Sequence, residues 1–144
     1  MIKKRGKKAV LVIEDDAESR NFMARVLELE GYQVLQADNS EQGIAVAREN
    51  HLALVLLDLQ LPGHDGGVVL VEVRNTPSLS TIPVIVITAS AAALQRERAL
   101  GMGATEYLVK PLSAASLREA VARILSRQRG SWNEVKEGTY SGSG

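Results

Sequence analysis

Four short apolar runs in this chain each end in a polar residue of a type that takes part in phosphate or metal chemistry. The polar residues are the acidic pair Glu14-Asp15, Asp58, Thr88 and Lys110. The apolar runs before them cover residues 9–13, 52–57, 84–87 and 107–109. Short β-branched runs of this kind are typical of buried strands. Because ligands of an open parallel sheet bind beyond the carboxyl ends of its strands, we expect these side chains to converge at one edge.

The residue types predict a site for a divalent cation and a phosphoryl group. Clustered carboxylates repel one another, and burial raises their pKa unless a cation lies between them. Mg²⁺ suits such a cluster, because it binds one or two carboxylates and keeps waters that phosphate oxygens can replace. Asp58 follows the most apolar run and is the expected nucleophile, since a carboxylate can accept phosphate covalently. Lys110 could pair with one phosphate oxygen, and the Thr88 hydroxyl could donate to another.

The segments between the strands have the features of helices, which favours a doubly wound parallel sheet. Asp16 is placed to cap a first helix, on which we expect Phe22, Val26 and Leu29 to form the apolar stripe. Gly31 stands where a left-handed C-terminal cap is expected.

The remaining elements have weaker patterns. Residues 32–35 predict a second strand, residues 91–102 an Ala-rich helix, and Ser113 the cap of a last helix. Residues 68–73 are rich in valine, which favours a strand. We nevertheless predict a helix there, because the next parallel strand requires a crossover connection.

Composition limits the classes of protein to which the chain can belong. Its 144 residues predict one domain, and aromatic residues make up only 3%, so the core must be aliphatic. The absence of cysteine excludes disulfides and thiolate metal sites. No apolar stretch approaches the roughly 18 residues that a membrane span needs, and the N-terminus has no apolar signal region. We therefore expect a soluble cytoplasmic domain.

The two ends of the sequence differ in character from its middle. Residues 1–7 form an arm rich in Lys and Arg, which we interpret as a solvated terminus because no aromatic or Arg pattern for base contacts accompanies it. Residues 130–144 are rich in Gly and Ser and lose all periodicity. We expect them to be a flexible tail, a linker to further sequence or an artificial extension left by cloning.

Four motifs, taken in order, resemble the receiver domain of two-component response regulators. They are Glu14-Asp15, the run Asp58-Leu59-Gln60-Leu61-Pro62-Gly63, Thr88-Ala89 and Lys110-Pro111. Their spacing agrees as well, with 43 residues from Asp15 to Asp58, 30 more to Thr88 and 22 more to Lys110. Any one of these motifs is weak, but the ordered set is strong. The resemblance covers about residues 8–129.

The resemblance implies a flavodoxin-like (βα)₅ fold with strand order 2-1-3-4-5 and a role as a phosphoacceptor. In that role Asp58 takes a phosphoryl group from a phosphohistidine on a sensor histidine kinase or a histidine phosphotransfer protein. The same match implies that Asp15 and Asp58 bind Mg²⁺ directly, together with the backbone carbonyl of Gln60. Glu14 would act through a metal-bound water.

The resemblance also implies a conformational switch. Thr88 and Tyr107 match the family's switch pair, in which the hydroxyl turns toward the phosphate and the ring swings inward. Lys110-Pro111 matches a site where the family has a cis peptide bond, and cis bonds are essentially confined to X–Pro. The switch would alter a surface made by residues 91–102, the strand over 107–109 and the last helix, for partners or a homodimer. We expect no direct contact with nucleic acid or membrane.

Two other classes of function remain open from the residues. One is a phosphohydrolase with an aspartyl-phosphate intermediate, but Gln60 stands where such an enzyme would carry a second acid, two residues after Asp58. In the resembled family, Gln60 and Ser90 occupy positions that tune the lifetime of the phosphate, and neither is an acid. The other class is a phosphorylation-independent interaction module, since a fold does not fix its function. The chain retains the whole set of acids, Thr and Lys, so we expect a signalling phosphoacceptor and not an enzyme.

Overall fold

The computed structural model describes residues 7–61 and 64–127. Most of the basic arm, the segment over residues 130–144 and the dipeptide Pro62-Gly63 lie outside these ranges. Within them, none of the helices has the length and apolarity needed to cross a membrane.

Five parallel strands form the central sheet in the order β2-β1-β3-β6-β7. Numbered along the sheet's own strands, this order is 2-1-3-4-5, so the expected doubly wound fold is confirmed. The strands are β1 (Ala9–Ile13), β2 (Gln33–Ala37), β3 (Leu54–Asp58), β6 (Val84–Thr88) and β7 (Glu106–Val109). Every residue of β1, β3 and β6 is buried, as expected for strands covered by helices on both faces.

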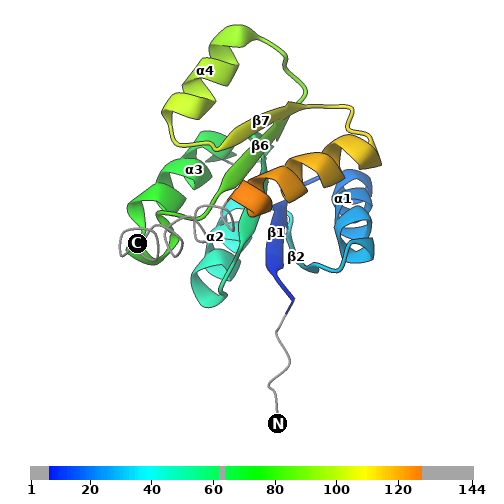
Figure 1. Ribbon diagram of the computed structural model, residues 1–144. Helices are drawn as coiled ribbons and strands as arrows, with labels where there is room; N and C mark the ends of the chain where they lie inside the picture. Colours follow the sequence, from blue (N-terminus) through cyan, green and yellow to red (C-terminus); the bar gives the residue numbers. More distant parts are fainter. Residues whose placement is uncertain (1–6, 62–63, 128–144) are drawn as a thin grey trace, which may run out of the picture.

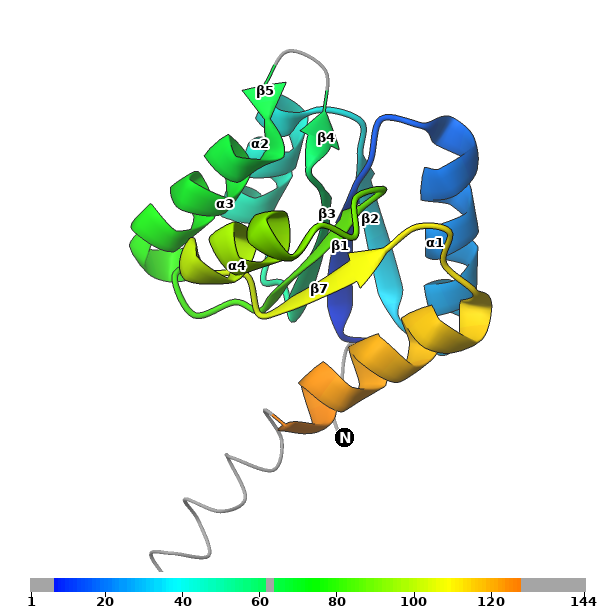
Figure 2. The same ribbon diagram turned by 90° about the horizontal axis from the view of Figure 1, so that it is seen from above.

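Helices cover both faces of this sheet, as Figures 1 and 2 show. On one side lie α2 (Ser40–Glu49), α3 (Gly66–Asn75) and α4 (Ala93–Gly101), and on the other lie α1 (Ala17–Leu29) and the C-terminal helix, residues 114–127. The Val-rich segment over residues 68–73 is helical, as the crossover argument predicted. Three shorter elements were not predicted: the antiparallel pair β4 (Gln60–Leu61) and β5 (His64–Asp65), and the 3₁₀ turn η1 (Pro77–Leu79).

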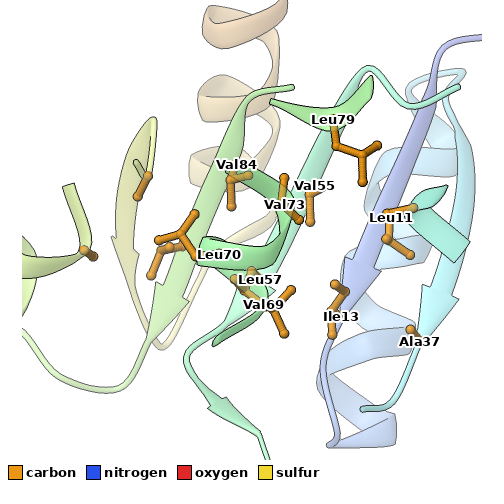
Figure 3. Packing of buried hydrophobic residues seen from close by; sticks show 14 residues of the cluster. Leu11, Ile13, Ala37, Val55, Leu57, Val69, Leu70, Val73, Leu79 and Val84 are labelled. Carbon is orange, nitrogen blue, oxygen red and sulfur yellow. The ribbon is translucent and has the colours of Figure 1, made fainter. Parts of the chain in front are cut away.

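Alternate residues of the strands belong to two separate hydrophobic clusters, one on each face of the sheet. Leu11, Ile13, Val55 and Leu57 point toward the α2 and α3 side, where Leu70 and its neighbours pack against them (Figure 3). The residues between them belong to the second cluster, beneath α1 and the C-terminal helix. The sheet edge that carries the polar residues is therefore held from both faces.

The first helix begins where expected but buries a different face. Asp16 caps α1 by accepting a hydrogen bond from the Ser19 backbone N–H. The predicted stripe is wrong in two of its three positions, since Phe22 is 43% exposed and Leu29 73% exposed. Met23 and Leu27 are buried in their place, beside the correctly predicted Val26. Phe22 and Leu29 have the spacing of a helical stripe, but the face of α1 that packs against the sheet is formed by the adjacent positions.

Two glycines occupy positions that a side chain could not fill without strain. Gly31, just after α1, has a φ of +95°, the left-handed conformation expected for that cap. Gly43 of α2 lies so close to β1 that an added Cβ would approach the Ile13 Cδ1 atom to 2.5 Å. This contact fixes α2 against the strand that precedes the acidic pair.

Arg74 of α3 ties two loops to the helix layer. Its guanidinium donates to the carbonyl oxygens of Gly103, at 2.7 and 3.0 Å, of Ile82, at 2.6 Å, and of Ser80, at 3.3 Å. Burial lowers the pKa of Arg74, although the group remains a cation at neutral pH. The turn after α4 is thereby fastened to α3 through backbone acceptors.

Replacing Arg74 by Lys should lower the free energy of unfolding by about 1–3 kcal/mol, because a single ammonium cannot reproduce this fork of hydrogen bonds. Arg48→Lys is the matched control. Arg48 bonds to Glu72 at 3.1 Å, but both side chains are exposed, and such surface pairs are worth about 0–1 kcal/mol. Urea denaturation of both variants measures the difference. Equal losses would contradict the assigned role of Arg74.

Candidate functional site

Parallel pairing aligns the carboxyl ends of four strands at one edge. In the register of β1 with β3, Glu14 follows β1 and comes level with Asp58. Thr88 stands one residue beyond the β6 partner of Asp58, and Lys110 one residue beyond the β7 partner of Thr88. The four residues therefore form a stepped row along the edge of the sheet.

Three carboxylates meet in this row. Glu14, Asp15 and Asp58 each offer a carboxylate oxygen, and these three atoms lie within 4.8 Å of one another. Glu14 is 0% exposed and Asp58 4% exposed, whereas Asp15 is open to solvent. Two acids of the cluster are thus buried, and the third, Asp15, is accessible to solvent.

Lys110 contacts both buried acids. Its Nζ atom lies 2.7 Å from the Glu14 Oε1 atom and 3.3 Å from the Asp58 Oδ2 atom. Burial alone would lower the pKa of Lys110, but the hydrogen bond with Glu14 and the charges of Asp58 and Glu14 outweigh burial and raise it. One ammonium therefore accompanies a cluster of three acids and pairs directly with the two buried ones. The peptide bond between Lys110 and Pro111 is cis.

Burial raises the pKa of Glu14 from 4.5 to about 7, and a hydrogen bond with Asp58 and its negative charge act in the same direction. The hydrogen bonds from Lys110 and from the backbone N–H of Asp16 oppose the rise. A buried acid whose charge is unfavourable is one that a bound cation would stabilise. The donor set, three carboxylates with one of them exposed, fits the oxygen ligands and retained waters that Mg²⁺ prefers.

Thr88, Ser90 and Tyr107 form a connected group next to the acids. Thr88 is buried, and its Oγ1 atom accepts a hydrogen bond from the Ser90 backbone N–H at 3.3 Å. The Tyr107 hydroxyl donates to the Ser90 carbonyl at 2.8 Å, and the Ser90 Oγ accepts from the Ala92 N–H at the start of α4. A cavity of about 220 Å³ lies beside Thr88, between α3 and α4. Ser90 therefore links the expected switch pair to the amino end of α4.

The structure brings most of the expected site residues together. Gln60 follows the acid cluster directly, and its backbone N–H donates to the Asp58 Oδ1 atom at 2.9 Å. Arg20 is the neighbour that the sequence did not reveal, with its Nη1 atom 2.9 Å from the Glu14 carbonyl oxygen. A cation within the first turns of a helix opposes the helix dipole, and that mismatch is the signal that could have drawn attention to it.

Comparison with known proteins agrees with this geometry. Residues 10–122 match the response regulator receiver domain. The chain belongs to that family. It is 36% identical over 135 residues to the transcriptional regulatory protein CpxR of Klebsiella pneumoniae, which covers 93% of the chain and 55% of CpxR. It is 35% identical over 117 residues to the phosphate regulon transcriptional regulatory protein PhoB of Pseudomonas aeruginosa, which covers 81% of the chain and 50% of PhoB.

Solved receiver structures have the same fold. A CheY-like receiver domain protein from Methanospirillum hungatei aligns with a TM-score of 0.81 at 26% identity, covering 87% of this chain and 98% of that one. A two-component response regulator from Clostridium difficile aligns with a TM-score of 0.80 at 28% identity, covering 85% and 98%. This receiver domain spans about half the length of the curated relatives that it matches. Its role is that of a phosphoacceptor in two-component signalling.

Magnesium should raise the melting temperature of this receiver domain, because a cation bound at the folded acid cluster would relieve carboxylate repulsion. At ten times the dissociation constant, linkage gives about 1.4 kcal/mol, or a rise of about 4 °C. Asp58→Asn should be more stable than the native chain in EDTA, by about 1 kcal/mol, because one repelling charge is removed. The same variant should gain less from magnesium.

Differential scanning fluorimetry at constant ionic strength measures both effects. Potassium chloride at matched ionic strength is the control for general screening. Equal melting temperatures of the native chain with and without magnesium would contradict the metal site.

Proposed function

We propose that Asp58 is the phosphoacceptor and that Asp15, Asp58 and the Gln60 carbonyl bind Mg²⁺, with Glu14 acting through a metal-bound water. One observation carries this proposal: a nearly buried carboxylate shares a notch with two further acids and with the Lys110 ammonium. We further propose that residues 8–129 form the receiver unit, between a basic arm over residues 1–7 and a tail over residues 130–144.

The proposed reaction transfers a phosphoryl group from a phosphohistidine to Asp58. A carboxylate oxygen of Asp58 attacks the phosphorus, and an O–P bond forms while the N–P bond of the donor breaks. The donor imidazole keeps the electron pair of the broken bond and takes up a proton. A bound Mg²⁺ supplies neutralisation of the phosphoryl oxygens. The Lys110 ammonium pairs with another oxygen of the transferred group.

The donor has a place to approach beside Lys110. A hollow of about 720 Å³ there is lined by Phe22 and Met23 of α1 and by Ala89, Pro111 and Leu112, as well as by Lys110 itself. The exposure of Phe22, unexpected from the helix pattern, has its explanation here, because the ring forms part of this wall. We propose that a sensor histidine kinase or a histidine phosphotransfer protein docks on this hollow in the cytoplasm.

Phosphorylation would then act on Thr88. If its hydroxyl turns to the phosphoryl group, the Ser90 N–H loses its present acceptor, and Ser90 also holds Tyr107 and the start of α4. The α4 helix is weakly attached, because Ala92 gives its amino end no side-chain cap and Ala99 is its buried residue. The proposed output surface comprises α4, β7 and the C-terminal helix, where Arg123 pairs with Glu106, and it would bind a partner or a second copy of the chain.

The alternatives are less well supported. A phosphohydrolase needs an acid or base near the aspartyl phosphate, and the residue two positions after Asp58 is Gln60. An interaction module without phosphorylation does not require the Lys110 ammonium to contact the buried acids Glu14 and Asp58. We therefore propose a signalling phosphoacceptor that catalyses only its own phosphorylation and dephosphorylation, with no direct contact to nucleic acid or membrane.

Incubation with acetyl phosphate and magnesium should add one phosphoryl group per chain, because the carboxylate and the neutralising charges are already in place. Intact mass spectrometry measures the gain. Asp58→Asn should abolish it, and Glu49→Gln is the control because Glu49 is exposed at the carboxyl end of α2, away from the acid cluster.

Two results would count against the proposal. Labelling that persists in Asp58→Asn would place the acceptor elsewhere. Steady release of phosphate from a small phosphomonoester, well beyond one equivalent, would favour the phosphohydrolase.

A phosphate mimic such as beryllium trifluoride should change self-association or partner binding. The mimic should draw Thr88 toward Asp58 and thereby shift the population of the two conformations of the proposed output surface. Analytical ultracentrifugation with and without the mimic measures self-association. Thr88→Ala should still bind the mimic but lose most of the response. Identical sedimentation of the native chain and identical partner binding in both conditions would contradict the switch.

A further inference from the structure

Arg20 of α1 reaches back over the start of its own helix to the acidic pair. Its Nη1 atom donates to the Glu14 carbonyl oxygen at 2.9 Å and lies 3.5 Å from the Asp15 carbonyl oxygen. Its Nε atom donates to the Gln36 side chain on the neighbouring strand β2, at 3.2 Å. The half-buried guanidinium therefore joins three segments: the turn after β1, the edge strand and α1.

The two carbonyls that Arg20 holds belong to a stretch of backbone between regular elements. β1 ends at Ile13 and α1 begins at Ala17, so Glu14 and Asp15 lie in the turn between them. The Glu14 N–H is fixed by the Ala37 carbonyl oxygen at 3.0 Å. The carbonyl side of the turn is held by Arg20, and the direction of the exposed Asp15 carboxylate depends on that backbone.

We infer that Arg20 is a positioning residue for the metal site, holding the backbone of Glu14 and Asp15 so that their carboxylates face Asp58. It acts through the peptide groups and does not itself contact metal or phosphate. This inference rests on the proposed magnesium site. Groups that orient metal ligands typically change metal affinity by 10–100-fold when they are removed.

A simpler role for Arg20 is that of a nearby positive charge, and the two roles predict opposite results. A mere countercharge competes with a cation, so Arg20→Gln would strengthen metal binding and Arg20→Lys would leave it unchanged. A positioning role depends on the several hydrogen bonds that the planar guanidinium makes at once, and Lys cannot reproduce them. Under our inference both variants weaken metal binding.

The test titrates the full chain with Mn²⁺, which shares the preference of Mg²⁺ for oxygen ligands, and counts free Mn²⁺ by electron paramagnetic resonance. Arg20→Lys and Arg20→Gln should each raise the dissociation constant about tenfold. Arg25→Gln is the matched control, because Arg25 is exposed on the same helix. Its dissociation constant should equal that of the native chain.

A second readout separates position from loss of structure. With acetyl phosphate, the magnesium concentration that gives half the maximal rate of phosphorylation should rise by the same factor in the Arg20 variants. The rate at saturating magnesium should stay near the native value, because the acids are intact. Circular dichroism verifies folding, and if Arg20→Gln melts below the assay temperature, Arg20→Lys decides the question.

The outcomes distinguish failure of the proposed metal site from failure of the positioning role of Arg20. Failure of the native chain to bind Mn²⁺ would overturn the proposed metal site and this inference with it. Native binding together with unchanged affinity in Arg20→Lys, or tighter binding in Arg20→Gln, would overturn the positioning role alone.

Discussion

Glu14 and Asp58 lie side by side at the ends of β1 and β3, although both are almost completely buried. If both were ionised, two unit charges at the 4.8 Å limit within which their carboxylate oxygens lie would repel by about 3 kcal/mol at an effective dielectric constant of about 20. Each fully buried Val, Leu or Ile side chain contributes about 1.5–3 kcal/mol. One or two residues of the all-buried strands are therefore enough to offset the repulsion, and the sheet holds together acids that would separate in solution.

The arrangement of the rest of the molecule follows from that forced proximity. Lys110 and the capping network of Asp16 offset part of the unfavourable charge, and the raised pKa of Glu14 shows that they do not offset all of it. A site of this kind is unfavourable in its resting form, and a bound cation would relieve it most. Local unfavourable energy that the core offsets is common at functional sites.

The sequence was most informative where burial is complete. β1, β3 and β6 are apolar up to the polar residues at their carboxyl ends, and these residues could be assigned to one edge because parallel strands share their direction. The helical faces were less predictable: Phe22 and Leu29 fit a stripe, yet packing selects Met23 and Leu27. Arg20 was missed because its partners beside the site are backbone carbonyls, which any sequence provides. Only its place in the first turns of α1, against the helix dipole, distinguishes it in the sequence.

The correct prediction of α3 depended on topology and not on local preference. Its valines favour a strand, but a parallel sheet leaves room there only for a crossover helix. The pair β4 and β5 was missed for the converse reason. Two-residue ladders depend on how the chain turns beyond Asp58, and no periodic pattern records that turn.

The sparse burial of α4 has an evolutionary consequence. Residues 91–98 are all exposed, whereas Glu14, Asp58 and the strands β1, β3 and β6 are buried. Substitutions along this outer helix can accumulate with little penalty to folding or to phosphate chemistry, since surface changes away from special contacts are usually within about 0.5 kcal/mol. Duplicated copies of such a gene could therefore diverge in the proteins that recognise them while preserving an identical reaction centre.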